Sequence, residues 1–143
     1  MKKMILILGL VLSVNVFAAD VEVKEAIIKP TLPGMQVTAI FTKIINNSDK
    51  DIKLLKVTGD FAGTFELHNM EMAGGKMIMR PVDFILLKSK STTELKSGGL
   101  HIMVFDVKRP VVEGSEYKAK LILDNKKEIP FAAKSLTMPA HHH

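Results

Sequence analysis

The chain has 143 residues, of which 20 are basic and 15 acidic, so its formal net charge is +5, and it contains no cysteine. The missing cysteines exclude disulfides, a lipid-modified cysteine and thiolate metal ligands. With one tyrosine, no tryptophan and lysines spread along the chain, nucleic-acid binding is not expected.

The N-terminus has the pattern of a secretory signal peptide. Lys2 and Lys3 precede an apolar run over residues 4–17, and small residues follow at Ala18 and Ala19. The alternative is a transmembrane anchor, but the run is shorter than the roughly 20 residues that a spanning helix needs. We therefore predict cleavage after a signal at residues 1–19, export to the periplasm, and a mature chain without a membrane span.

The rest of the chain consists of short segments typical of strands, separated by turn-forming residues. Residues 21–27 alternate apolar and polar side chains, and the β-branched segment 36–45 stops at Asn46-Asn47-Ser48. The expected strands cover residues 21–27, 36–45, 52–57, 64–68, 84–87, 92–96, 100–105, 117–123 and 128–133.

This pattern predicts an all-β fold. After the signal, apolar residues nowhere recur with the 3.6-residue period of a helix, and turn signals return every 8–12 residues. These are features of a Greek-key β-sandwich or barrel. We expect one such domain over residues 20–136, working as a monomer.

Histidine and methionine cluster in one part of the chain. Four of the nine methionines lie between Met70 and Met79, and the only two histidines outside the extreme C-terminus, His68 and His101, bracket the segment from His68 to Met103. Thioethers and imidazoles, without thiolates or carboxylates among the candidates, suit copper and in particular Cu(I).

A hairpin turn controls whether these side chains can meet. If Gly74 and Gly75 form a two-residue loop, Met70 pairs with Met79, and His68 lies on the same face. A three-residue loop would place Met79 on the opposite face. Since His101 and Met103 also share one face of their strand, we predict a Cu(I) site formed by His68, Met79, His101 and Met103.

The spacing of these four residues resembles a known family signature. Ten residues separate His68 from Met79, twenty-one separate Met79 from His101, and one separates His101 from Met103. This is similar to the H-x10-M-x21-H-x-M pattern of PCuAC-type periplasmic copper chaperones, and the resemblance covers essentially the whole chain after the signal.

The resemblance implies a cupredoxin-like barrel that binds Cu(I) through those four residues and is not an enzyme. It also implies a protein acceptor for the copper, either a cytochrome c oxidase subunit carrying the dinuclear copper centre or a Sco-type protein. An alternative role is general periplasmic copper tolerance or storage.

Other soft side chains are candidates for auxiliary metal binding. We expect Met70, Met72 and Met77 to form a partly exposed rim around the site. Residues 137–143 are expected to be a disordered tail in which imidazoles could capture Cu(II). The auxiliary candidates in this tail are Met138, His141, His142 and His143.

Two further interpretations remain open. The chain could be a copper-dependent redox enzyme, although it has no additional histidine cluster or nucleophilic triad. It could also be a plain β-sandwich scaffold, in which case His68 and His101 should point away from each other. Glu66, Glu71 and Asp83 are expected to be solvated strand positions.

Overall fold

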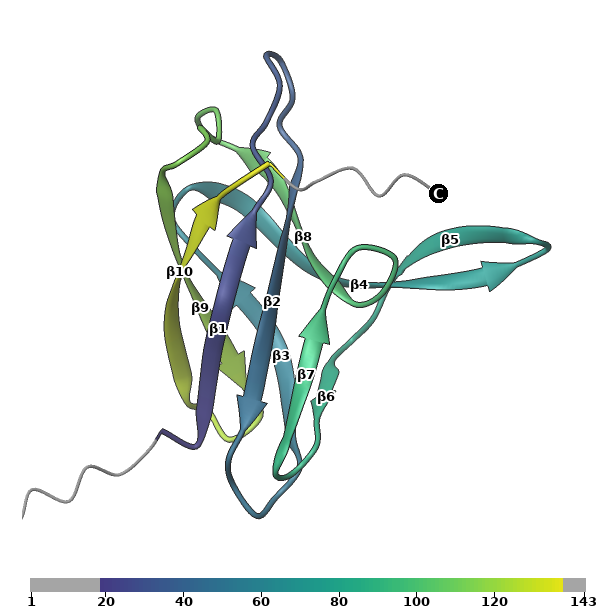
Figure 1. The fold of residues 1–143 in the computed structure, drawn as a ribbon, viewed down its shortest axis with the longest axis vertical. Helices are drawn as coiled ribbons and strands as arrows, with labels where there is room; N and C mark the ends of the chain where they lie inside the picture. Colours follow the sequence, from purple (N-terminus) through teal and green to yellow (C-terminus); the bar gives the residue numbers. More distant parts are fainter. Residues whose placement is uncertain (1–18, 138–143) are drawn as a thin grey trace, which may run out of the picture.

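The computed structural model describes residues 19–137, and these residues form strands, turns and loops without a helix. Ten strands follow one another along the chain (Figure 1). They are β1 (Val21–Ile28), β2 (Thr38–Asn46), β3 (Ile52–Thr58), β4 (Ala62–Ala73), β5 (Lys76–Pro81), β6 (Ile85–Leu87), β7 (Ser91–Leu95), β8 (His101–Val107), β9 (Glu116–Leu123) and β10 (Glu128–Ser135).

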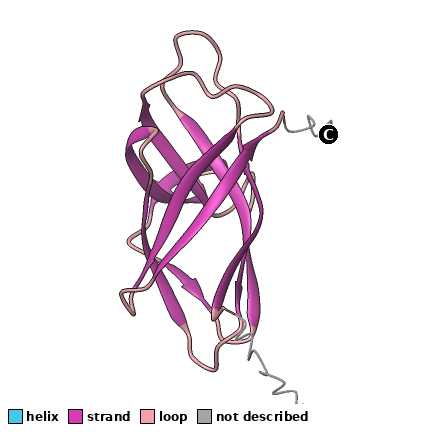
Figure 2. Ribbon diagram, turned by 90° about the vertical axis from the view of Figure 1, so that its left-hand side faces the viewer, coloured by secondary structure: helices cyan, strands magenta, loops and turns pink. Residues whose placement is uncertain are grey.

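The strands belong to one mixed sheet that curves around a single core (Figure 2). Neighbouring strands follow the order β5-β4-β8-β2-β1-β10-β9-β3-β6, and β7 pairs with β2. Strands β1 and β10 run parallel, whereas the other pairs are antiparallel. The chain thus places β4 and β8, which are distant in sequence, side by side.

Alternating side chains on β8 point to the core and to the opposite face of the sheet. On β8, Ile102 and Val104 are fully buried in the core, together with Leu67 of β4 and Ile40 of β2. Because successive side chains point to opposite faces, His101 and Met103 project away from that core. The apolar residues of β8 therefore anchor a strand whose other face is free for a site.

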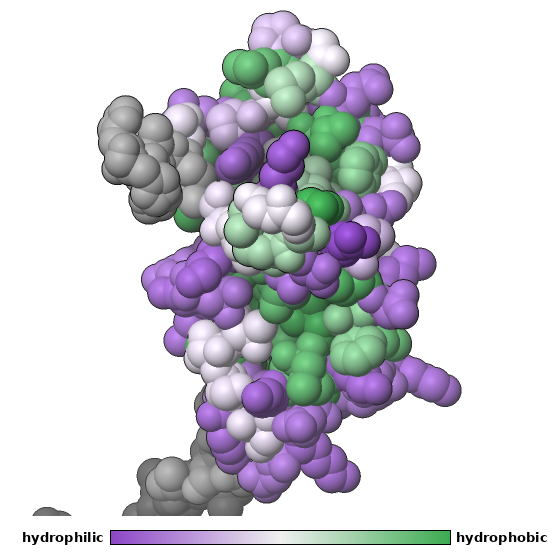
Figure 3. Space-filling view, turned by 90° about the vertical axis from the view of Figure 1, so that its right-hand side faces the viewer, coloured by the Kyte–Doolittle hydropathy of each residue, from purple (hydrophilic) through white to green (hydrophobic). Residues whose placement is uncertain are grey.

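The hairpin of β4 and β5 extends away from the body of the molecule (Figure 1). All six residues of β5 are exposed to solvent. Figure 3 views the molecule from the side on which this hairpin projects, and hydrophobic side chains gather around the hairpin on that face. The hairpin is held to the body through β4, whose first half pairs with β8.

The predicted all-β class is confirmed, and each expected strand is present, with ends shifted by a few residues. The largest difference is β4, which continues to Ala73 because its second half forms the hairpin with β5. Among residues 19–137 there is no helix that could span a membrane. Residues 1–18 of the predicted signal peptide and the auxiliary donors Met138 and His141 to His143 lie outside the described residues.

Candidate metal centre

Two histidines face each other on neighbouring strands. His68 of β4 is the direct cross-strand partner of His101 of β8, and the centroids of their rings are 5.8 Å apart. The two residues are only 7% and 4% exposed. A scaffold role predicts histidines that point away from each other, so this arrangement contradicts that alternative.

Phenylalanine rings pack against both imidazoles. Phe41 lies 6.2 Å from His101, and Phe105 lies 6.1 Å from His68, measured between ring centroids. Ring pairs at this separation pack favourably against each other. Both imidazoles are therefore enclosed by neighbouring side chains, in agreement with their low exposure.

Each imidazole has one nitrogen that is hydrogen-bonded and one that is not. His101 Nδ1 lies 2.8 Å from the Gly99 carbonyl oxygen, and His68 Nε2 lies 2.6 Å from Glu66 Oε2. Both oxygens accept, so these two ring nitrogens donate, and the hydrogen bonds assign the tautomers. The remaining atoms, His101 Nε2 and His68 Nδ1, are buried without a partner.

Unpartnered buried nitrogens are unfavourable and need an explanation. Both carry a lone pair in the assigned tautomer, because the proton is on the other nitrogen. A lone pair fixed in this way is what a neutral imidazole presents to a metal ion. The donor chemistry of His68 and His101 therefore fits a metal ligand.

The hairpin turn adopts the two-residue loop that the sequence predicts. Gly74 and Gly75 both have positive φ angles, of 59° and 78°. Positive φ at both central positions is the requirement of a type I′ turn, which glycine meets without strain. In the resulting register Met70 pairs with Met79, so Met79 is on the same face as His68. The predicted register is confirmed.

A cavity of about 350 Å³ collects the soft side chains next to His101. Met79 from β5, His101 and Met103 from β8, and Met70 from β4 all line this cavity. His68 is not among the lining residues and lies beside the cavity, adjacent to the His101 ring. Three of the four predicted ligands thus share one cavity, and the fourth is their immediate neighbour.

The other hairpin methionines differ in position. Met72 and Met77 pair with each other nearer the hairpin tip and are 66% and 50% exposed. Neither lines the cavity, whereas Met70 does. Of the three predicted rim residues, only Met70 is therefore placed to contact an ion in the cavity.

Two residues near the site were missed by sequence reasoning. Glu66 is not simply solvated, as expected, because its carboxylate accepts the hydrogen bond from His68. Its i, i+2 spacing to His68 could have indicated a shared face. Met35 follows the Pro33-Gly34 turn and lines the cavity from the loop between β1 and β2, and no local pattern distinguishes it from an ordinary loop methionine.

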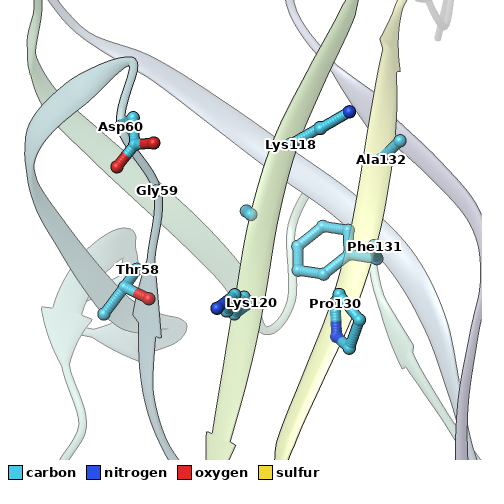
Figure 4. Close-up of a pocket in the computed structure, with 9 residues that line it drawn as sticks. Thr58, Gly59, Asp60, Lys118, Lys120, Pro130, Phe131 and Ala132 are labelled. Atoms are coloured by element: carbon cyan, nitrogen blue, oxygen red, sulfur yellow. The ribbon is translucent and has the colours of Figure 1, made fainter.

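Harder donors are not gathered here. Among residues 19–137 no three histidine, cysteine, aspartate or glutamate side chains converge as a metal site. A larger pocket, of about 650 Å³, lies between the turn after β3 and strands β9 and β10 (Figure 4). Its lining contains neither histidine nor methionine. Of these two pockets, only the cavity beside β8 combines imidazole and thioether side chains.

Fold and side chains together define a small all-β domain with imidazole and thioether side chains grouped at one end of its sheet. The family model described as "Putative lipoprotein LpqE-like" matches residues 21–135. The chain belongs to this LpqE-like family, which is a family of PCuAC domains.

Solved structures of PCuAC domains share the fold. The copper-bound PCuAC domain from PmoF2 superposes with a TM-score of 0.72 at 16% identity, covering 85% of this chain and 97% of that chain. The Cu(I)-bound solution structure of DR1885 from Deinococcus radiodurans gives a TM-score of 0.59 at 26% identity, covering 79% and 77%. The predicted PCuAC resemblance and cupredoxin-like fold class are confirmed.

One curated relative is a longer protein that matches only part of this chain. The uncharacterized protein RP573 of Rickettsia prowazekii (strain Madrid E) is 27% identical over 89 residues, which cover 62% of this chain. The chain spans about half the length of this relative, of which 49% is aligned. The copper-binding fold is therefore supported by the structural neighbours rather than by this relative.

Proposed function

We propose that this protein binds a single Cu(I) ion as cargo through His68, Met79, His101 and Met103, and hands it to a protein acceptor. The observation that carries the proposal is the pair of buried imidazoles, each with one nitrogen hydrogen-bonded and the other free. PCuAC neighbours described as copper-bound support the same role.

Ligand chemistry gives the carrier its direction of transfer. The two imidazoles and two thioethers are all neutral, so the site holds a monovalent soft ion without forming the strong bonds of a thiolate cage. An acceptor that offers thiolates can remove the ion by ligand exchange. We propose a cytochrome c oxidase subunit or a Sco-type protein as that acceptor, with copper tolerance or storage as the alternative role.

Export is part of the proposal. A periplasmic location is supported by the signal-like residues 1–19 and by the description of the family as a putative lipoprotein. We also propose that the C-terminal histidines His141 to His143, with Met138, capture Cu(II) as an auxiliary function. A copper carrier of this kind is not an enzyme. Oxygen consumption by the copper-loaded protein should therefore be no faster than in buffer alone.

The direct test is an anaerobic Cu(I) titration against a chromogenic chelator. The purified protein should take about one Cu(I) per chain from the chelator. The His101→Ala variant should no longer compete with the chelator for Cu(I). Cu(I) binding by the His101→Ala variant at the strength of the original protein would contradict the proposal. Mixing the loaded protein with a dithiol acceptor should then transfer copper in that direction only.

A further inference from the structure

Glu66 occupies a position from which it can control one metal ligand. It lies two residues before His68 on β4, so both side chains are on the same face of the strand. Its cross-strand partner on β8 is Met103, another candidate ligand. Glu66 is thus a neighbour of two of the proposed copper donors without being one of the soft donors itself.

The hydrogen bond between Glu66 and His68 is short, and His68 is its donor. Glu66 Oε2 lies 2.6 Å from His68 Nε2, and a carboxylate only accepts hydrogen bonds. The proton of the neutral imidazole is therefore on Nε2, which leaves the buried Nδ1 with a lone pair. Hydrogen bonds to an ionised acceptor are about twice as strong as neutral ones, so this tautomer is strongly favoured.

His101 reaches the same result by a different route. Its Nδ1 donates to the backbone carbonyl of Gly99, which leaves Nε2 free. The two histidines therefore present opposite ring nitrogens, Nδ1 from His68 and Nε2 from His101. Only His68 has a side chain as its hydrogen-bond acceptor, so only its tautomer can be changed by replacing the acceptor residue.

We propose that Glu66 is a positioning residue that holds His68 in the Nδ1-ligating tautomer and orientation, and so raises the Cu(I) affinity of the site. This inference rests on the proposed function. The carboxylate has a second effect in the same direction, because it places one negative charge beside a monovalent cation whose four ligands are neutral.

The first measurement reads the tautomer in the metal-free protein, by long-range ¹H–¹⁵N correlation of the histidine rings. His68 should show a proton on Nε2 in the original protein and in Glu66→Gln, whose amide oxygen can still accept. Glu66→Ala should lose this single tautomer. His101 should keep its proton on Nδ1 in every variant, because its acceptor is a backbone carbonyl.

The second measurement is Cu(I) affinity by chelator competition. Glu66→Ala should bind about 10–100-fold more weakly, the usual loss on removing an outer hydrogen-bond partner of a metal ligand, and Glu66→Gln should lie between it and the original. Glu71→Ala is the matched control, since Glu71 is on the same strand, faces the other side and pairs with Arg80 at 3.2 Å. It should retain the original affinity.

Several results would overturn the inference. An unchanged His68 tautomer and affinity in Glu66→Ala would show that Glu66 does not position the ring. A loss in Glu66→Gln as large as in Glu66→Ala, with the tautomer retained, would show that the negative charge of Glu66, and not its positioning of the ring, supports Cu(I) binding. If the original protein bound no Cu(I) while the tautomer still depended on Glu66, the proposed function alone would fail.

Discussion

Ala39 of β2 lies directly opposite Met103 of β8 and lines the same cavity. A small side chain at this position leaves space beside the thioether of Met103. The cavity of about 350 Å³ therefore depends on Ala39 as well as on the proposed metal ligands that line it.

Replacing Ala39 with Leu should fill part of this space and weaken Cu(I) binding. Crowding by added methylene groups costs about 1–3 kcal/mol when the surroundings cannot yield, and here the loss should appear in copper affinity because the added atoms occupy the cavity. Chelator competition measures it. Ala132→Leu, at an exposed position of β10, is the control and should bind copper normally.

The two hairpin methionines Met79 and Met72 should differ in their effect on copper. Met79 lines the cavity, whereas Met72 is near the hairpin tip and does not. We expect Met79→Leu to weaken Cu(I) binding by at least about tenfold, equivalent to about 1.4 kcal/mol. Met72→Leu should change it little. Equal effects in the two variants would remove Met79 from the ligand set.

The conformation of the Gly74-Gly75 turn should affect Cu(I) affinity, because it sets the register that places Met79. Gly75 has a φ of 78° and nothing lies within 4 Å of the position of an added Cβ, so only backbone strain opposes substitution. Gly75→Val should destabilise the hairpin by about 1–2 kcal/mol, whereas Gly75→Asn should be milder because asparagine visits this region more readily. Faster amide exchange in β5 and weaker Cu(I) binding should follow in the valine variant.

That prediction separates local strain from a general loss of folding. Amides of β9 and β10, which are far from the hairpin in the strand order, should exchange at their original rates in Gly75→Val. Copper affinity that stays unchanged while β5 exchanges rapidly would mean that Met79 is not needed for binding.

His101→Phe should lower the stability of the metal-bound protein more than that of the metal-free protein. The variant loses the hydrogen bond to Gly99 but also removes the unpartnered Nε2. These effects oppose each other, so the free energy of unfolding should change by within about 1 kcal/mol. Thermal unfolding with and without Ag(I), a redox-inert mimic of Cu(I), measures both states.

Ag(I) at roughly 100 times its dissociation constant should stabilise the original protein by about 2.7 kcal/mol. The His101→Phe variant should show much less stabilisation at the same concentration. The same stabilisation in both proteins would place the ion somewhere other than beside His101.

Much of the fold follows from local sequence pattern. The period-two alternation of residues 21–27 becomes β1, and the β-branched run before Asn46 becomes β2. Gly74-Gly75 predicts the hairpin register correctly because a two-residue turn needs positive φ at both positions. These features depend on neighbouring residues, so the sequence carries them without knowledge of the tertiary fold.

Pairing between distant strands could not be derived in this way. Strand β8 lies between β4 and β2, and β1 runs parallel to β10. Many registers between such strands satisfy the same apolar alternation, and the packing of the whole core selects among them. The contact between His68 and His101 results from that selection.

The sequence alone therefore determined the strands, the hairpin turn and the set of soft donors from His68 to Met103. Only the tertiary structure decided which ring nitrogens are free, that Glu66 accepts from His68, and that Met35 and Ala39 line the cavity. The physical reason is that propensity and turn chemistry act over a few residues, whereas burial and hydrogen-bond partnership depend on segments brought together from across the chain.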